Sequence, residues 1–161
     1  FNIGDFNPYT PDSLTVINKK KIKFHFLSYY LRWDPQEVYY YASQNTGFNA
    51  NTERTQGTYS KYSSIDDKID YFHYYTTLIK FGIGRATYDA SQEVRNGKIT
   101  RDEAIYLVKK YDTEFPHKYF EDFLEYINLS EKDFVKIIEK FRNKFLWKKI
   151  KNKWALKYTV Y

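Results

Sequence analysis

The sequence predicts a mainly α-helical fold of about six helices, followed by a β-hairpin at its C-terminal end. Helix-capping residues stand before several segments, glycines stand after them, and apolar residues recur at three- and four-residue intervals in between. With 161 residues, of which 42% are hydrophobic and 29% charged, the chain is long enough for one domain with a core. Aromatic residues make up 21% of the chain, and tyrosine hydroxyls need partners, so we expect a partly polar core.

The first 33 residues carry weaker signals than the rest. Residues 1–24 contain Pro8 and Pro11 in Asn-rich sequence, and we interpret them as a connector. The chain begins with Phe1 and contains no Met, so we expect a missing N-terminal half upstream of it. Residues 25–33 are aromatic and apolar, which predicts either a buried strand or a docking segment.

The first well-signalled helix follows Asp34. This residue suits the N-cap, Pro35 the first helical position and Glu37 the capping-box position, while Gly47 stands just past the expected end. Residues 48–64 are polar and rich in Asn, Ser and Thr, so we expect a loop there.

Two helices are expected on either side of the Gly-Ile-Gly break at residues 82–84. The second helix of the chain should span Ile65–Phe81 and the third Arg85–Asn96, with Gly97 closing it. The inward face of the second helix should carry apolar residues at helical spacing: Ile69, Phe72, Tyr75 or Thr76, and Ile79.

Three further helices complete the predicted helical region, residues 25–145. A capping box of Thr100 and Glu103 starts the fourth helix, which ends at Tyr111. Pro116 starts the fifth, to Ile127, and Ser130 with Asp133 starts the sixth, to Arg142. The expected inward residues of the fourth and sixth helices are Ala104, Leu107, Val108, Tyr111, Phe134, Ile137, Ile138 and Phe141.

Residues 146–161 predict the C-terminal β-hairpin. Leu146–Ile150 and Trp154–Tyr158 are apolar and aromatic and flank Lys151-Asn152-Lys153. Trp147 and Trp154 form a cross-strand aromatic pair in the simpler interpretation, while stacking on single-stranded bases is the alternative.

Charge and composition exclude several classes of protein. The chain has no Cys, which excludes disulfides, thiolate metal sites and cysteine nucleophiles within it. Without an apolar run long enough to span a membrane, it is expected to be cytoplasmic. The net charge of +6 is concentrated in residues 19–23 and 140–157, and we favour a solvated basic surface over a nucleic-acid interface.

Residues 57–87 concentrate polar chemistry between aromatic residues and are the candidate site for an anionic ligand. Gly82, Gly84, Arg85 and Thr87 open a helix, where backbone N–H groups bind anions; a tight turn between closely packed helices is an equal alternative. The preceding segment offers a flexible glycine, two hydroxyls and a lysine, although an ordinary loop is the more common meaning of such a motif; these residues are Gly57, Thr58, Ser60 and Lys61.

A cation site is conceivable at the start of the second helix. Asp66, Asp70 and His73 would share one helix face, and Asp67 lies beside them, which allows an oxygen-rich Mg²⁺ site. The favoured interpretation is that the aspartates offset the helix dipole and that His73 is a hydrogen-bonded interior residue. Residues 92–103 imitate part of a calcium-binding loop, but Val94 stands at a ligand position, so calcium is rejected.

Several blocks in fixed order resemble the C-terminal half of the N-acetyl sugar amidotransferases. This bacterial family serves surface-polysaccharide synthesis and includes the pseudaminic acid and lipopolysaccharide amidotransferases. The resemblance covers residues 25–150. Its blocks include Trp33–Glu37, Gly57–Tyr62, Asp66–Asp70, His73–Tyr75, Ile79–Thr87, Glu93–Arg101, Glu114–Pro116 and Leu146–Lys149.

The resemblance implies the C-terminal part of a larger α/β enzyme of the adenine-nucleotide alpha-hydrolase, or ATP-pyrophosphatase, type. The phosphate loop would lie in the missing N-terminal half, so this segment alone should be inactive. The whole enzyme would use ATP and Mg²⁺ to adenylylate an N-acetylated sugar, and ammonia from separate glutaminase and channel subunits would displace AMP to leave an amide or amidine.

Within this chain, the resemblance and charge together suggest roles for the polar residues of segment 57–87. Lys61 and Arg85 would stabilise negative charge on pyrophosphate or adenylate, with Lys80 a weaker candidate. His73 could contact the sugar, and the three aspartates could bind Mg²⁺. We expect Lys61 and Arg85 to converge on one pocket. The alternatives are a basic helical nucleic-acid-binding module and a subunit-docking module.

Overall fold

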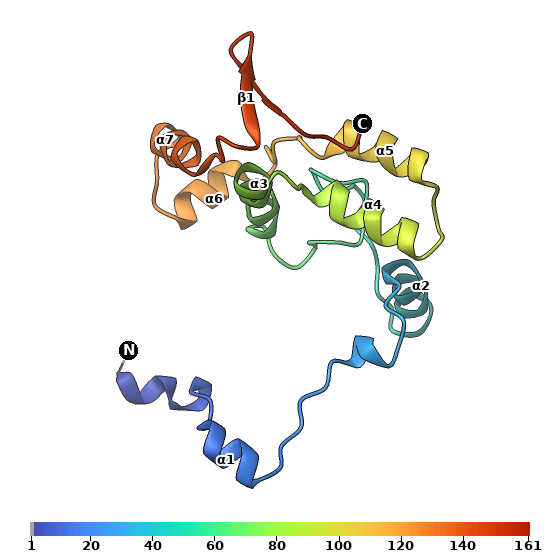
Figure 1. The fold of residues 1–161 in the computed structure, drawn as a ribbon, viewed down its shortest axis with the longest axis vertical. Coiled ribbons are helices and arrows are strands. Elements are labelled where there is room, and N and C mark those ends of the chain that lie inside the picture. The colour runs from blue at the N-terminus through green and yellow to red at the C-terminus, as the bar shows by residue number, and fades with distance from the viewer. Residues whose placement is uncertain (1) are drawn as a thin grey trace. The chain divides into compact units, whose positions relative to one another are not determined.

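The computed structural model describes residues 2–161, which form two compact units divided after Trp33 (Figure 1). The first unit contains a 3₁₀ helix at Ile3–Tyr9, the short helix α1 (Leu14–Lys19) and a 3₁₀ turn at Leu27–Tyr29. None of its described residues is buried. The rest of the chain, residues 34–161, holds six α-helices and a hairpin among the residues described, so the mainly helical class is confirmed.

The aromatic segment at residues 25–33 forms no strand. Phe26 and Tyr29 within it are 71% and 85% exposed, and Phe24 just before it is 84% exposed. The expected buried strand is therefore wrong, because the segment has neither a pairing partner nor a cover among the residues described. The alternative of a docking segment stays a prediction.

Helix α2 (Pro35–Asn45) starts as the capping residues predict. The Asp34 side chain accepts hydrogen bonds from the backbone N–H groups of Gln36 and Glu37, each at 3.2 Å. Glu37 forms an ion pair with Lys98, whose ammonium also lies 3.6 Å from Asp34. Lys98 thereby ties the start of α2 to the turn that follows α4.

Helix α3 (Asp70–Phe81) begins five residues later than predicted. Ser64 adopts a left-handed backbone conformation, with φ of 54°, and its hydroxyl donates to Asp70. The Asp67 carboxylate accepts from the N–H of Ile69 at 2.6 Å. These side-chain bonds stabilise turns in place of a first helical turn.

The pair α4 (Arg85–Arg95) and α5 (Arg101–Tyr111) confirms the third and fourth predicted helices. Thr100 and Glu103 form the expected capping box at the start of α5. The two helices pack side by side through small residues, since Ala90 and Ala104 are buried together with Val108.

Helices α6 (Phe120–Tyr126) and α7 (Glu131–Phe141) depart from prediction in detail. Pro116 does not start α6; it is fully buried, and the Lys118 N–H that follows donates to the Gln56 side chain, so a turn precedes the helix. Ser130 caps α7 as expected. Phe141, predicted to lie inward, is 58% exposed, because it is the last residue of α7 and lies beyond Phe134 and Ile138, the buried residues of that helix.

The hairpin consists of β1 (Trp147–Ile150) and β2 (Lys153–Leu156). Its turn is only two residues, Lys151 and Asn152, both with positive φ (46° and 65°), as in a type I′ turn. Lys153 therefore belongs to the strand. Trp147 pairs with Leu156 and Trp154 pairs with Lys149, so the two tryptophans lie on neighbouring strands in diagonal positions and not directly opposite each other.

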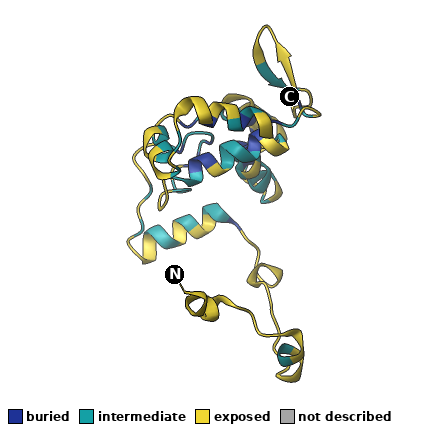
Figure 2. Cartoon of the chain, turned by 90° about the vertical axis from the view of Figure 1, so that its left-hand side faces the viewer, coloured by how far each residue is buried: buried dark blue, intermediate teal, exposed yellow. Residues whose placement is uncertain are grey.

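The main core lies where α3, α7 and β1 meet. Leu78 and Ile79 of α3 pack with Phe134 and Ile138 of α7 and with Trp147. Aromatic rings from α6 extend this core, as Phe123 stacks on Phe72 with centroids 4.0 Å apart. Figure 2 shows buried residues in the helical part of the chain after Trp33, and those that lie within helices belong to α3, α4, α5 and α7. No helix in the described part of the chain has the length and apolar character needed to cross a membrane.

Candidate functional site

The loop around Gly57 and the start of α4 meet, as the sequence predicts. The Ala86 N–H donates to the Gly57 carbonyl at 3.0 Å. Thr58 is fully buried, and its hydroxyl donates to Asp89 of α4 at 2.6 Å. Residues from both predicted phosphate motifs therefore form one polar network.

The α4 N-terminus binds a carboxylate of the chain itself. Asp112, just after α5, accepts from the N–H groups of Gly84 and Thr87 at 3.1 and 2.8 Å, and from the Thr87 hydroxyl at 2.9 Å. Burial raises the pKa of Asp112, although these hydrogen bonds act to lower it. The helix start therefore binds an anion, as one interpretation predicts. That anion is a side chain of the same chain, which fits the close packing that the other interpretation predicts.

Gly84 is needed for this close approach. A Cβ on Gly84 would lie 2.6 Å from the Asp112 backbone oxygen and 2.7 Å from its side-chain oxygen. Asp112 thus lies so close to the start of α4 that even a methyl group on Gly84 would collide with it. An external phosphate therefore has no space at the same N–H groups.

A carboxylate of the chain also binds the backbone of the Gly57 turn. Its N–H donates to Glu114 at 2.8 Å, and Arg54 makes a two-pronged ion pair with that carboxylate at 2.6 and 2.7 Å. The Arg54 hydrogen bond is the main reason why the pKa of Glu114 is lowered. The expected phosphate-binding role of Gly57 and Thr58 finds no open donor here.

Arg85 is also engaged within the fold. Its Nε donates to Asp89 at 3.0 Å, Asp70 lies 3.8 Å from its Nη1, and its guanidinium stacks over Tyr74 at 4.1 Å from the ring centroid. Burial raises the pKa of Asp89, while the charge of Arg85 opposes that rise. Arg85 therefore holds the network together.

The other residues of the predicted site line neither of the two cavities described below. Lys61, His73 and Lys80 are exposed, and Ser60 is buried with its hydroxyl 3.0 Å from that of Ser63. Gly82 ends α3 in a left-handed conformation, with φ of 74°. The expected convergence of Lys61 and Arg85 on one pocket finds no support in the two cavities described below, which neither residue lines.

The predicted shared face of Asp66, Asp70 and His73 is wrong. Helix α3 begins at Asp70, so Asp66 and Asp67 lie in the preceding turns and are exposed. Across residues 2–161, no three Asp, Glu or His side chains gather closely enough to hold a metal ion. The described part of the chain supplies no ligand set for Mg²⁺.

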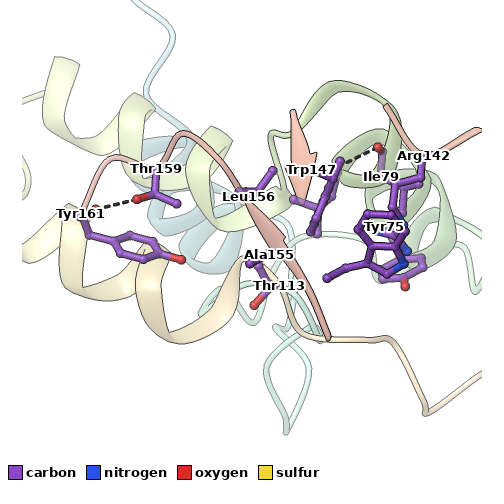
Figure 3. Close-up of a pocket in the computed structure, with 11 residues that line it drawn as sticks. Tyr75, Ile79, Thr113, Arg142, Trp147, Ala155, Leu156, Thr159 and Tyr161 are labelled. Carbon is purple, nitrogen blue, oxygen red and sulfur yellow. Dashed lines mark hydrogen bonds between the residues drawn. The ribbon is translucent and has the colours of Figure 1, made fainter. Parts of the chain in front are cut away.

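A cavity of about 520 Å³ opens between α3, the end of α7 and the hairpin (Figure 3). Arg142 supplies the one charged side chain in its lining within residues 2–161, and hydroxyl groups come from Tyr75, Thr113, Thr159 and Tyr161. Leu78, Ile79, Trp147, Trp154, Ala155 and Leu156 supply the apolar walls. A concave apolar cavity with a few convergent polar groups is the usual form of a ligand site.

Arg142 is held in a fixed position at one end of this cavity. Its side chain is only 7% exposed and lies between two indoles, with Trp147 and Trp154 at 4.8 and 4.9 Å from the guanidinium. Its Nε and Nη2 both donate to one oxygen of Glu139, at 3.0 and 2.9 Å. The Trp154 N–H donates to the other Glu139 oxygen at 2.8 Å.

Tyr75 and Arg142 also line a second cavity of about 470 Å³. This space lies against α6 and α7 and includes Glu139, His117 and several aromatic residues. Burial raises the pKa of Tyr75, while the charge and hydrogen bond of Arg142 act to lower it. The Tyr75–Arg142 pair is thus common to both cavities.

The sequence contains little that identifies the cavity beside Arg142. Arg142 was expected only as the last residue of a helix, and the two tryptophans as a cross-strand pair. The available signal was Arg142 at the end of an amphipathic helix, followed within twelve residues by both tryptophans of the hairpin. Only the hairpin register shows that both indoles face the arginine.

Comparison with known families concerns the same part of the chain. A family model described as "LPS biosynthesis protein WbpG-like, C-terminal domain" matches residues 56–160. This range contains helices α3 to α7, the hairpin and every residue lining the larger cavity except Tyr161. No curated protein matches the chain.

Proposed function

Because the chain belongs to the family of WbpG-like lipopolysaccharide (LPS) biosynthesis proteins, we propose that it is part of an ATP-dependent N-acetyl sugar amidotransferase of that pathway. In this proposal an upstream half adenylylates a sugar oxygen, and ammonia from a glutaminase partner displaces AMP to form an amide or amidine. The family match over residues 56–160 carries the proposal. The ordered blocks that resemble N-acetyl sugar amidotransferases support it.

The geometry favours a division of work between the two halves of such an enzyme. The residues of this chain do not fit the phosphates of ATP, since Asp112 and Glu114 already accept from the N–H groups of Gly84, Thr87 and Gly57. The described residues also hold no cluster of three Asp, Glu or His side chains, so Mg²⁺ would take further ligands from the nucleotide or from the upstream half. We therefore assign ATP and Mg²⁺ to the upstream half and derive no step through them here.

This chain would then supply the surface that receives the sugar. The larger cavity, of about 520 Å³, has hydroxyl groups, apolar walls and the Arg142–Glu139 ion pair at one end. These features suit a polar ring better than a triphosphate. Exposed Lys61 remains a candidate for contact with the negative charge that develops in the reaction.

The proposal is tested in a longer protein that includes the upstream half. AMP release should depend on both ammonia and an N-acetylated sugar. Lys61→Ala should lower its rate at least about tenfold, while Lys132→Ala, an exposed lysine on α7, should not. A protein that releases no AMP with any N-acetylated sugar would contradict the activity, and an unchanged rate in Lys61→Ala would remove that residue from it.

The docking alternative keeps one supporting observation, and the nucleic-acid alternative loses its main one. Phe24, Phe26 and Tyr29 are exposed, as a docking segment requires. Base stacking needs open aromatic faces, but Trp147 is 6% exposed and Trp154 lies between Arg142 and Lys149. The hairpin is therefore poorly suited to bind single strands.

A further inference from the structure

The cavity beside Arg142 is large enough to receive a sugar ring. Its volume of about 520 Å³ falls within the range of small-molecule sites, roughly 300–1,000 Å³. In Figure 3, Tyr161 and Thr159 stand at one end and Tyr75 and Arg142 at the other, with Leu156 and Ala155 between them. Polar groups at both ends and an apolar wall between them match a ring that carries polar substituents on its rim and C–H groups on its face.

The polar end of the cavity is preorganised. Glu139 fixes the guanidinium of Arg142 through two of its five N–H groups, and Trp154 fixes Glu139 in turn. Trp147 is anchored by its own N–H, which donates to the Ile79 carbonyl at 2.9 Å. A ligand that meets this end would find donors already in place, so little ordering is needed on binding.

The charge of the cavity selects a neutral ligand group. Among the described residues, Arg142 contributes the one charged side chain in the lining, and the adjacent Glu139 balances that charge. A phosphate placed there would compete with Glu139 for the same guanidinium and meet no second cation. An amide carbonyl or a hydroxyl can accept from those guanidinium N–H groups that donate to neither Glu139 nor Tyr75, without breaking the ion pair.

We propose that this cavity binds the neutral ring of an N-acetylated sugar, with the acetamido carbonyl toward Arg142 and the ring face against Leu156 and Ala155. This assignment rests on the proposed function, because it names the site of that enzyme's sugar. It places any phosphate or nucleotide attached to the sugar outside the cavity.

The test uses the complete chain and the fluorescence of the cavity tryptophans. The chain has three tryptophans, and Trp33 lies in the first unit, so Trp33→Phe leaves only Trp147 and Trp154 as reporters. In this background N-acetylglucosamine and its uridine diphosphate conjugate should both change the emission, with the free sugar binding in the millimolar range, about 1–10 mM. Uridine diphosphate alone and glucose should change it much less.

Matched variants locate the response. Tyr161→Ala removes a cavity residue and should weaken sugar binding at least about fivefold, while Tyr158→Ala, which removes an exposed tyrosine outside the cavity lining, should not. Thr113→Phe should block binding by filling the cavity, and Thr52→Phe, at an exposed threonine elsewhere, should leave it intact. All four positions are exposed polar or aromatic sites, Tyr161 at 50%, so their replacement spares the core.

Three results would overturn the assignment. These are no response to N-acetylglucosamine or its conjugate, an equal response to uridine diphosphate alone, or equal binding in Tyr161→Ala and Tyr158→Ala. Because the assay measures binding to this chain, its result is separate from AMP release. Sugar binding without AMP release would contradict the amidotransferase activity, whereas AMP release without sugar binding here would contradict only the assignment of this cavity.

Discussion

Asp112 and Glu114 lie two residues apart in the connection from α5 to α6, and each carboxylate occupies a backbone turn that its glycine makes accessible. Asp112 binds the start of α4 and Glu114 binds the Gly57 turn, where Arg54 supports it. The two glycine turns that the sequence predicts to bind phosphate therefore hold the α5–α6 connection against the start of α4 and against the Gly57 loop. Such internal anions make these residues stability determinants.

Asp112→Asn should lower the free energy of unfolding by about 1–3 kcal/mol at neutral pH, because the amide nitrogen cannot accept from the Gly84 N–H. Urea unfolding followed by circular dichroism measures this loss. Asp102→Asn, at an exposed residue in the first turn of α5, is the control and should change stability by less than about 0.5 kcal/mol. Equal effects of the two changes would contradict the structural role of Asp112.

Glu114 predicts a pH dependence. Arg54 lowers the pKa of Glu114 below its ordinary value, so its stabilising contribution is complete above the unfolded-state pKa, near 4.5, and disappears as pH falls through the lowered folded-state pKa. Glu114→Gln should therefore lower the free energy of unfolding by about 1–2 kcal/mol at pH 7. This loss is smaller than for a fully buried ion pair, because both side chains are partly exposed to solvent.

Unfolding of both proteins between pH 7 and pH 3 checks this prediction. The difference should stay constant down to about pH 4.5 and shrink below it. Glu121→Gln, an exposed glutamate on α6, is the matched control. A difference that grows as the pH falls would refute the sign of the pKa shift.

At the scale of elements, local signals decided most boundaries, and competing side-chain bonds decided the exceptions. Helices α2, α5 and α7 begin where capping residues predict, and α4 begins directly after the predicted glycine break. Helix α3 starts late because Ser64 and Asp67 bond locally, and α6 starts late because Pro116 is buried in the core. The hairpin turn is shorter than predicted because two residues with positive φ suffice to reverse the strand.

The hairpin turn can be improved by design. Lys151 and Asn152 both adopt positive φ, a conformation that costs Lys more than Asn and that Gly adopts freely. Replacing them by Asn-Gly should raise the free energy of unfolding by about 0.5–1 kcal/mol. Thermal unfolding measures the gain, and Gly-Pro at the same two positions should lose stability, since Pro cannot adopt the positive φ of the second position. No gain from Asn-Gly would argue against the type I′ turn.

Gly84 tests the packing of α4 against the α5–α6 connection. Gly84→Ala places a Cβ 2.6 Å from a backbone oxygen of Asp112 and should cost about 2–4 kcal/mol, since that oxygen cannot move independently of its chain. Gly47→Ala, which has a positive φ but no neighbour within 4 Å, should cost only about 1 kcal/mol. Comparable losses in the two variants would mean that the connection yields easily.

At the scale of the whole molecule, the chain divides into a first unit with no buried residue described and a second unit that contains both cores. The two core clusters draw their buried and packed residues from Tyr59 to Leu156. The first unit instead carries exposed aromatic side chains beside a lysine-rich stretch at residues 19–23. The stability of the fold therefore resides after Trp33.

A fragment of residues 34–161 should consequently fold with nearly unchanged stability. Its thermal midpoint should lie within about 4 °C of that of the complete chain, because no core residue is removed. Differential scanning calorimetry of both proteins checks this. Loss of the cooperative transition in the fragment would show that residues 1–33 contribute to the core.

The sequence by itself determined the helical class, most helix starts and the presence of a C-terminal hairpin, because caps, glycines and apolar spacing act over a few residues. It also brought Gly57, Thr58 and Arg85 into one predicted site, and they do meet in one network. Tertiary structure alone decided what that network binds, since Asp112 and Glu114 arrive from a distant connection. It alone placed Arg142 between two tryptophans, because the register of a hairpin and its contact with α7 depend on packing between segments that no local pattern encodes.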